Sequence, residues 1–245
     1  MTAVAIVGRF TLFVGTIVAA GLSKPPPAGR TFAHAYSIGV RSLPILLIIC
    51  GFIGTNLSLQ GYSAFIPMGG ERLVGLFVAL AGVKELAPIL AASMVAAKAG
   101  TEMASQIAVM RVREQIDALE VMAVNPQWYL VVPRLLGILL VMPALTIIST
   151  FVMVTAAYLA AVYQLGINGA DFLEYAEGAI TPWDLVFAMG KGVLFGGIIC
   201  LVSCYNGFRS APGPRGVGVA TNRAVVVSAV TCVIINYFVS EFLYG

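Results

Sequence analysis

The chain has 245 residues, of which 60% are hydrophobic and only 10% are charged. Soluble globular domains carry about 45–50% apolar and about 25% charged residues, so this chain cannot cover a water-exposed surface. Its formal net charge of +3 comes from basic residues scattered between apolar runs, which gives no support for nucleic-acid binding. The composition predicts a polytopic membrane protein with a single membrane domain over residues 1–245 and no soluble domain.

The N-terminal segment, residues 1–30, contains the apolar run FTLFVGTIVAAGL followed by SKPPPAG. The run is too short to cross a bilayer comfortably, and Arg9 lies where its other end would have to be apolar. We expect this segment to form an interfacial helix. A sixth span or an uncleaved signal-like segment is the alternative.

Five later apolar runs are long enough to cross a membrane, because a helix needs about 20 residues to span roughly 30 Å of hydrocarbon. They lie at about residues 43–60, 73–97, 130–163, 183–206 and 220–243. The third run contains Pro133 and Pro143, so we expect it either to be tilted and extend beyond the bilayer or to kink at Pro143. The predicted fold class is an all-α polytopic membrane protein with an N-terminal interfacial helix and five transmembrane helices.

Basic residues are distributed unevenly between the segments that connect these runs. With the N-terminus in the cytoplasm, Arg72 is the only basic residue in an external segment. The inner segments contain Arg9, Lys24, Arg30, Arg41, Lys98, Arg111, Arg113, Arg209 and Arg215. Because cytoplasmic segments carry the excess of Lys and Arg, we expect a cytoplasmic N-terminus and an external C-terminus.

The segment REQIDALEVMAVNP connects the second and third runs on the predicted cytoplasmic side, and it has the pattern of a short amphipathic helix that Asn125 and Pro126 end. Carboxylates line one face and apolar side chains a neighbouring face. The acidic positions are Glu114, Asp117 and Glu120, and the apolar ones are Ile116, Leu119, Met122 and Ala123. An anionic inner leaflet would repel the carboxylates, which favours a protein partner with basic or polar groups. A solvated loop helix resting on headgroups is the alternative.

Three charged residues, Lys84, Glu85 and Lys191, fall within the predicted bilayer depth. Each would cost about 2.5–3.5 kcal/mol at mid-membrane, so each is expected to face protein, water or a ligand headgroup. Lys84 and Glu85 are adjacent and point about 100° apart on a helix, so they cannot simply neutralise one another. A structural ion pair between helices and a polar contact on a lipid pathway both explain them.

Catalytic and metal chemistry have little support in this sequence. No GxxxxGK[ST] loop is present to bind nucleotide phosphates, and His34 is the only histidine. The four cysteines, Cys50, Cys200, Cys204 and Cys232, all lie in apolar runs, as small buried hydrophobic residues do. We therefore expect no catalytic residue, no metal site and no cofactor in this chain.

The segment EQIDALEVMAVNP resembles the MlaE/YrbE family of lipid ABC transporter permeases. The resemblance continues upstream through KELAPILAASMVAAKAGTEMASQIAVMRVR and downstream to GVGVATNRAVVVSA, and it covers the chain from about Arg41 to its end. It implies that the loop helix is a coupling helix that docks on a cytoplasmic ABC ATPase dimer, which binds the ATP and Mg. The implied docking residues are Glu114, Gln115, Asp117, Leu119, Glu120 and Met122.

The resemblance also implies the function: the permease subunit of an ATP-driven transporter in the bacterial inner membrane. Its substrate would be a phospholipid, fatty acid or sterol-like amphiphile, moved to or from an external MCE-domain protein past Lys84, Glu85 and Lys191. KELAP in place of the common RELGP, and AKAG in place of a GRVG-like run, are most like the actinobacterial Mce-associated permeases, which pair unlike subunits. The second permease copy is thus identical or homologous. A secondary transporter with a Lys/Glu relay and a non-transporting membrane scaffold are the alternatives.

Overall fold

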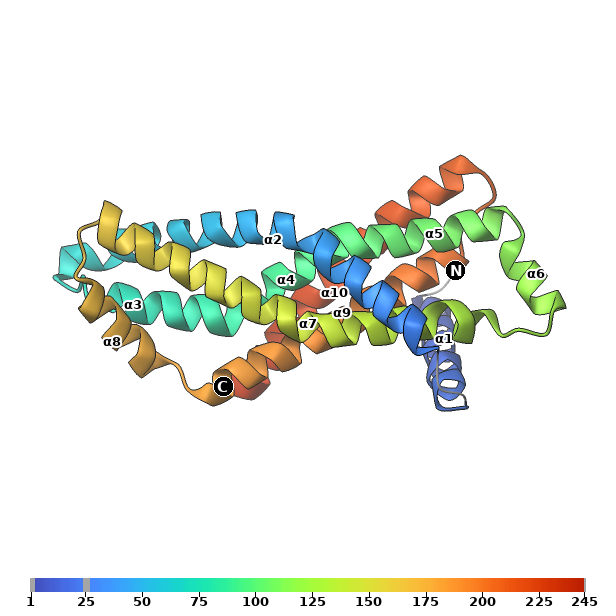
Figure 1. Cartoon of the computed structure of the whole chain (residues 1–245), viewed down its shortest axis with the longest axis horizontal. Helices are drawn as coiled ribbons and strands as arrows, with labels where there is room; N and C mark the ends of the chain where they lie inside the picture. Colours follow the sequence, from blue (N-terminus) through green and yellow to red (C-terminus); the bar gives the residue numbers. More distant parts are fainter. Residues whose placement is uncertain (1–2, 24–26, 245) are drawn as a thin grey trace. The chain divides into compact units, whose positions relative to one another are not determined.

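The computed structural model describes residues 3–23 and 27–244. Lys24, which entered the topology prediction, and Gly245 lie outside the described residues. Within the described part all regular structure is helical (Figure 1). Five helices are long and apolar enough to cross a membrane, and a shorter apolar helix precedes them. The predicted all-α fold with five membrane helices is confirmed.

The elements follow one another with short connections. In chain order they are α1 (Ala3–Ser23), α2 (Ala28–Phe65), η1 (Ile66–Met68), α3 (Leu73–Phe77), η2 (Val78–Leu86), α4 (Ala87–Val95), η3 (Ala96–Gly100), α5 (Thr101–Val112), α6 (Gln115–Val121), α7 (Pro126–Leu159), η4 (Ala160–Gln164), α8 (Gly169–Ala179), α9 (Pro182–Phe208) and α10 (Pro214–Tyr244). The five spans are α2, the run from α3 to α5, α7 with η4, α9 and α10.

The helix α7 is much longer than the bilayer requires. It has 34 residues, or about 51 Å at 1.5 Å per residue, and it continues through both Pro133 and Pro143. A bilayer core is roughly 30 Å thick, so part of α7 lies outside the hydrocarbon. Hydropathy marks only the apolar part of a helix, whereas backbone hydrogen bonding continues into its polar ends.

Asn125 and Pro126 have a different role from the predicted one. The sequence predicts that they end the loop helix, but α6 already ends at Val121. The Asn125 side chain accepts hydrogen bonds from the backbone N–H groups of Gln127 at 2.9 Å and Trp128 at 3.3 Å, and Pro126 is the first residue of α7. The pair therefore starts α7, as an N-cap followed by a proline at the first helical position does.

The chain divides into two compact units, each made of three segments. The first unit consists of Met1–Arg41, Val95–Val141 and Phe195–Cys232, and the second of Ser42–Met94, Met142–Leu194 and Val233–Gly245. In the first unit α1 is attached to the last turns of α9. Ile17 is buried, and the Phe13 ring makes edge contacts with Tyr205 at 5.4 Å and Phe208 at 5.8 Å between ring centroids.

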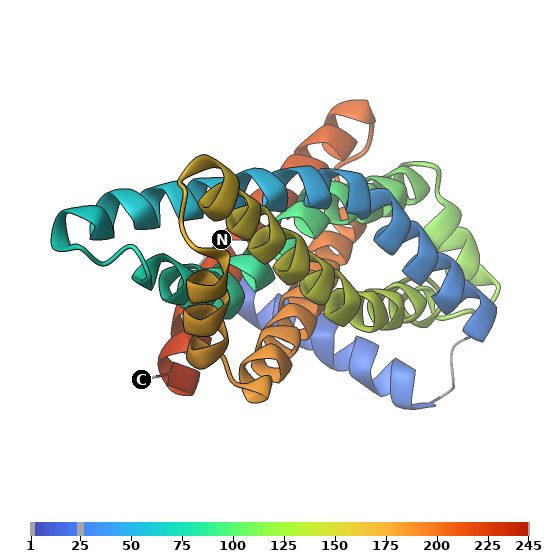
Figure 2. The same ribbon diagram turned by 60° about the vertical axis from the view of Figure 1, so that its left-hand side comes forward.

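The second unit has a core in which α8 lies alongside α3 (Figure 2). Phe172 of α8 is fully buried against apolar side chains that include Val74 and Val78. Asn168 caps α8, accepting a hydrogen bond from the N–H of Ala170 at 3.0 Å. Gly75 allows the close approach, because a Cβ at this position would clash with the carbonyl group of Phe172. The core thus fixes the loop helix α8 to the start of the second span.

Candidate functional site

The loop helix α6 is held between two tight turns that connect it to α5 and α7 (Figure 1). Glu114, just before α6, has φ 56°, and Ala123, just after it, has φ 57°. Positive φ is uncommon for residues other than glycine, so the backbone reverses sharply at both positions. The predicted helix is present over Gln115–Val121, and Glu114 precedes it instead of lying on its acidic face.

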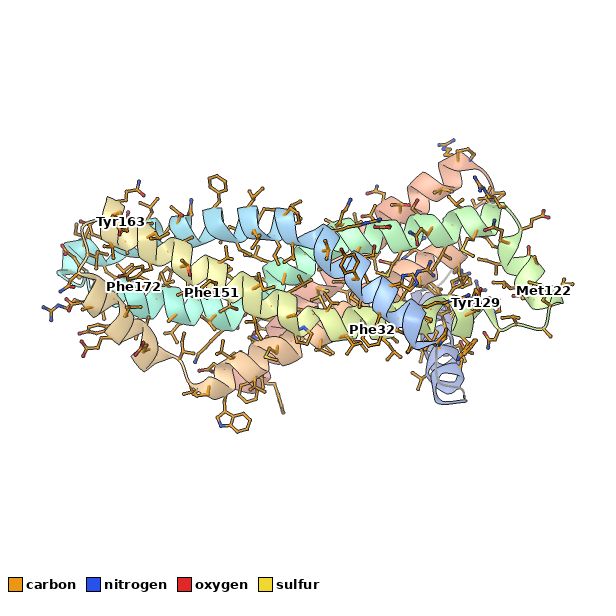
Figure 3. The ribbon with its side chains drawn as sticks, in the orientation of Figure 1. Phe32, Met122, Tyr129, Phe151, Tyr163 and Phe172 are labelled. Carbon is orange, nitrogen blue, oxygen red and sulfur yellow. The ribbon has the colours of Figure 1, made fainter. Side chains whose placement is uncertain are left out.

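One apolar side chain attaches α6 to the rest of the first unit, while others stay open. Ile116 is 2% exposed and Leu119 is half-buried. Val121 and Met122 are 88% and 64% exposed, and Figure 3 shows Met122 pointing away from the helices. The predicted apolar face therefore divides, because α6 ends before Met122. Ile116 and Leu119 face the unit, and Val121 with Met122 forms an uncovered apolar end.

The three acidic residues of the predicted docking face also differ from one another. Asp117 forms an ion pair with Arg111, whose Nη1 donates a hydrogen bond to Asp117 Oδ1 at 2.5 Å. Glu114 and Glu120 are exposed and make no ion pair among the described residues, and Gln115 is exposed as well. The free carboxylate closest to the apolar end is thus that of Glu120, whereas Asp117 is already paired within the chain.

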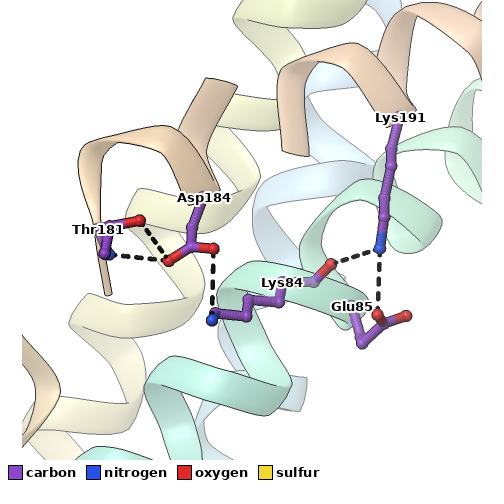
Figure 4. Close-up of polar contacts among 5 residues, drawn as sticks. All are labelled: Lys84, Glu85, Thr181, Asp184 and Lys191. Atoms are coloured by element: carbon purple, nitrogen blue, oxygen red, sulfur yellow. Dashed lines mark hydrogen bonds and ion pairs between the residues drawn. The ribbon is translucent and has the colours of Figure 1, made fainter. Parts of the chain in front are cut away.

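The second set of predicted residues lies in the second unit and forms a polar cluster with Lys191 at its centre (Figure 4). The Lys191 side chain is fully buried. Its ammonium group donates to Ser240 Oγ at 2.7 Å, to the Lys84 carbonyl at 3.0 Å and to Glu85 Oε1 at 3.1 Å. A lysine has three N–H donors, so every donor of Lys191 is satisfied.

The Lys84 carbonyl that accepts from Lys191 lies in an irregular part of the second span. Lys84 is within η2, a π-helix, a form that appears mostly as short bulges and is frequent at functional sites. Its carbonyl accepts from the Lys191 ammonium at 3.0 Å, and this contact fixes α9 to the second span.

Lys84 and Glu85 have separate partners, as the prediction that they cannot neutralise one another requires. Lys84 Nζ lies 3.3 Å from Asp184 Oδ1. Glu85 uses both oxygens, since its Oε2 accepts from the Asn236 side-chain amide at 3.0 Å. The Tyr244 ring covers both cations, with its centroid 4.9 Å from Lys84 Nζ and 5.0 Å from Lys191 Nζ. The three predicted charges are therefore members of interhelical ion pairs.

The sequence reasoning missed the partners in this cluster. Asp184 falls at the edge of the fourth predicted run and was not singled out there, whereas it is 5% exposed at the start of α9 and pairs with Lys84. The Thr181-x-x-Asp184 spacing was a usable signal, because it is the pattern of a capping box. Asp184 Oδ2 indeed accepts from the Thr181 backbone N–H at 2.8 Å and hydroxyl at 2.9 Å. Asn236 and Ser240 carried no such local signal.

The cluster remains partly open at Glu85, whose side chain is 36% exposed. In the same unit a cavity of about 350 Å³ is lined by residues of α2 that include Phe52 and Asn56, and by Leu86, the neighbour of Glu85. Phe52 is 75% exposed. The exposed apolar surface at this cavity suits contact with an amphiphile. The polar cluster is not suited to bond-breaking chemistry, since each of its charges is bound to a fixed partner.

Metal ligands are not grouped in the part of the chain that the structure describes, where no cluster of three or more His, Cys, Asp or Glu side chains could hold an ion. Cys50, Cys200, Cys204 and Cys232 are free thiols, and all four are buried. They match the predicted small hydrophobic residues of the spans.

A protein-family model described as "Permease MlaE" matches residues 31–242. A probable ABC transporter permease protein of Rickettsia felis is 36% identical over 238 residues, which cover 97% of this chain and 92% of the relative. A probable ABC transporter permease protein of Synechocystis is 35% identical over 215 residues, covering 88% and 82%. The chloroplastic protein TRIGALACTOSYLDIACYLGLYCEROL 1 of Arabidopsis thaliana is 36% identical over 240 residues, covering 91% and 68%.

Proposed function

The chain belongs to the MlaE permease family, and we propose that as the permease subunit of a lipid ABC transporter it couples ATP hydrolysis on a cytoplasmic partner to lipid movement. The family match over residues 31–242 carries this conclusion. The five membrane helices supply the multi-pass domain that a permease requires. The sequence contains no phosphate-binding loop of its own, so ATP and Mg belong to a partner ATPase dimer.

The proposed contact with the ATPase is the exposed end of α6. Glu120 offers a carboxylate without an ion-pair partner among the described residues, next to the uncovered side chains of Val121 and Met122. An exposed apolar end bordered by charge is typical of a protein interface. Ile116 ties α6 to the first unit, so a force on α6 reaches the membrane helices instead of moving a free loop.

The proposed lipid contact is the polar cluster around Lys191 together with the apolar surface near Leu86. A relative is named for trigalactosyldiacylglycerol, a glycerolipid, which supports a lipid substrate for this chain. The Glu85 side chain is 36% exposed, and Leu86, the next residue in the chain, lines the cavity. The ion pairs themselves are structural, and the proposed transport role belongs to the open side of Glu85.

Further partners are proposed from the resemblance. α10 is the least buried of the five spans, and its exposed aromatic residues Phe238 and Phe242 suit contact with a second, identical or homologous permease. An MCE-domain lipid-binding protein is the proposed external partner, and the bacterial inner membrane is the proposed location. The paired state of the buried Lys191 weighs against a secondary transporter that would use it as a proton relay.

Mass spectrometry of the gently solubilised complex tests this proposal. We expect peptides of an ABC ATPase, a second permease and an MCE-domain protein together with bound lipid. A permease that copurifies with lipid but with no ATPase would contradict ATP-driven transport and favour the secondary transporter. An associated cytoplasmic protein without ATPase activity would favour the scaffold.

A further inference from the structure

A basic cavity of about 550 Å³ lies at the end of α9 and the start of α10, within the first unit. The side chains that matter for its chemistry are those of Tyr205, Asn206, Arg209, Ser210, Arg215 and Arg223. Three arginines line it, and no aspartate or glutamate does. Neither the coupling helix nor the polar cluster around Lys191 uses these residues.

The loop that closes the cavity is built with glycines at the positions that demand them. Gly213 has φ 93°, a conformation that side chains other than glycine rarely adopt. Gly216 lies so close to the Ala211 carbonyl that a Cβ would clash with it. The loop therefore folds tightly against the first turn of α10. Ser210 Oγ is buried there without a hydrogen-bond partner and is a donor left for a ligand.

The positive charge in the cavity is not neutralised by the chain. Arg209 donates to the Tyr205 hydroxyl at 2.5 Å, and its guanidinium lies 5.3 Å from the centroid of that ring. Arg215 and Arg223 make no ion pair or side-chain hydrogen bond among the described residues. The N-terminal end of α10 adds the positive end of a helix dipole. The positive charge of the cavity therefore favours an anion as its ligand.

An apolar strip continues from the arginines along α10. Residues at spacings of four, seven and eleven share one side of a helix, which places Val219, Arg223, Val226 and Val230 on the same side. The three valines are 61%, 54% and 54% exposed. A soluble anion would have no use for this strip, whereas the acyl chain of a lipid would cover it.

We propose that this cavity binds the headgroup phosphate of an anionic phospholipid, with Arg215 and Arg223 as its main ligands and the valine strip against an acyl chain. Basic pockets between membrane helices on the cytoplasmic side are suited to such headgroups, because guanidinium groups bind phosphate with paired hydrogen bonds. The inference does not rest on coupling through α6, since binding to the isolated permease measures it.

Native mass spectrometry of the solubilised full chain tests the proposal, with phosphatidylglycerol, phosphatidylcholine and sn-glycerol 3-phosphate as separate probes. We expect phosphatidylglycerol to bind at least tenfold more tightly than phosphatidylcholine or glycerol phosphate. Arg215→Gln together with Arg223→Gln should weaken phosphatidylglycerol binding at least tenfold, since each charge-assisted contact is worth about tenfold or more. The charge-keeping pair Arg215→Lys and Arg223→Lys should bind phosphatidylglycerol more tightly than the glutamine pair but more weakly than wild type, because lysine keeps the charge and loses the paired hydrogen bonds.

Arg113→Gln is the matched control, because it removes the same charge from an exposed arginine outside the cavity. It should leave phosphatidylglycerol binding within about twofold of wild type. Wild-type binding by the double glutamine variant would overturn the proposal. Equal binding of glycerol phosphate and phosphatidylglycerol would overturn the lipid assignment in favour of a soluble phosphate. If the double glutamine variant lost a protein partner while its lipid binding stayed unchanged, the proposal would be overturned in favour of an acidic protein segment as the ligand of the cavity.

Discussion

Lys191 shows how a cation is tolerated inside an apolar protein. Its three donors are bound by the Ser240 hydroxyl, the Glu85 carboxylate and the backbone carbonyl of Lys84. Removing one member of a buried ion pair is strongly destabilising, because the remaining charge is neither paired nor solvated by water. Lys191 is fully buried, whereas Arg41, which pairs with Glu102 at 2.7 Å, has a side chain 58% exposed.

This contrast predicts different costs for two identical substitutions. Glu85→Gln leaves the buried Lys191 ammonium without its anion and should destabilise the solubilised permease by about 1.5–3 kcal/mol. Glu102→Gln leaves Arg41 in contact with water and should cost less than about 1 kcal/mol. Thermal unfolding of the two variants in the same detergent measures the difference. Equal, negligible shifts in Tm would show that the Glu85 pair has no specific role.

Replacing both members of the pair provides a second check on the same idea. Lys191→Met in the Glu85→Gln background removes the unpaired charge, so the double variant should be more stable than the sum of the two single changes predicts. A strictly additive loss would contradict direct coupling of the two side chains.

The partners of the membrane charges mark the limit of sequence reasoning at the residue scale. The high free-energy cost of placing a charge inside the bilayer is enough to identify Lys84, Glu85 and Lys191 as residues that need polar contacts. Asn236 and Ser240 lie 151 and 49 residues along the chain from the groups they contact, and no local pattern encodes such a distance. Periodicity tells which residues lie in a span but not which spans are neighbours.

At the scale of elements, α3 and α8 illustrate a packing contact that depends on a missing side chain. Gly75→Ala would push a methyl group against the Phe172 carbonyl and should lower stability by about 1–3 kcal/mol. Gly51→Ala is the matched control, because a Cβ at Gly51 meets nothing within 4 Å, and it should leave Tm unchanged or raise it. Both Tm values come from the same thermal melt. A tolerated Gly75→Ala would contradict the close α3–α8 contact.

The amphipathic pattern predicts some features of the loop helix α6 but not others. Its existence, the inward position of Ile116 and the exposure of Glu120 follow from the 3.6-residue period. The positive φ angles of Glu114 and Ala123 do not, because nothing in a Glu or Ala side chain indicates a left-handed backbone. The period therefore predicts one long apolar face, whereas the turns cut the helix to seven residues and leave Met122 outside it.

At the scale of the whole molecule, the uneven distribution of basic residues predicts an external C-terminus. A cysteine at Glu241, which is exposed near the end of α10, should react with an impermeant thiol reagent added to intact cells. A cysteine at Arg113 should react only after lysis. The four native thiols are replaced first, although all are buried. Labelling of Arg113→Cys from outside, together with protection of Glu241→Cys until lysis, would show that the membrane domain has the opposite orientation, which is the result expected if α1 crosses the membrane from a cytoplasmic N-terminus.

We propose that an ATPase drives this permease through α6. Glu120→Lys reverses a carboxylate that has no partner among the described residues, and Val121→Asp places a charge on the exposed apolar end of the helix. Reversing Asp117 is a less direct test, because it would also break the ion pair with Arg111. Glu174→Lys on the exposed surface of α8 is the matched control for charge reversal.

The most direct measurement is ATP-dependent lipid transfer by the reconstituted complex, with capture of the ATPase and a size-exclusion profile recorded on the same preparations. Glu120→Lys and Val121→Asp should each lose at least tenfold in ATPase capture and in lipid transfer, while the permease elutes as wild type does and Glu174→Lys keeps both activities. Wild-type capture and wild-type ATP-dependent lipid transfer by both α6 variants would contradict the account and leave α6 a solvated loop helix.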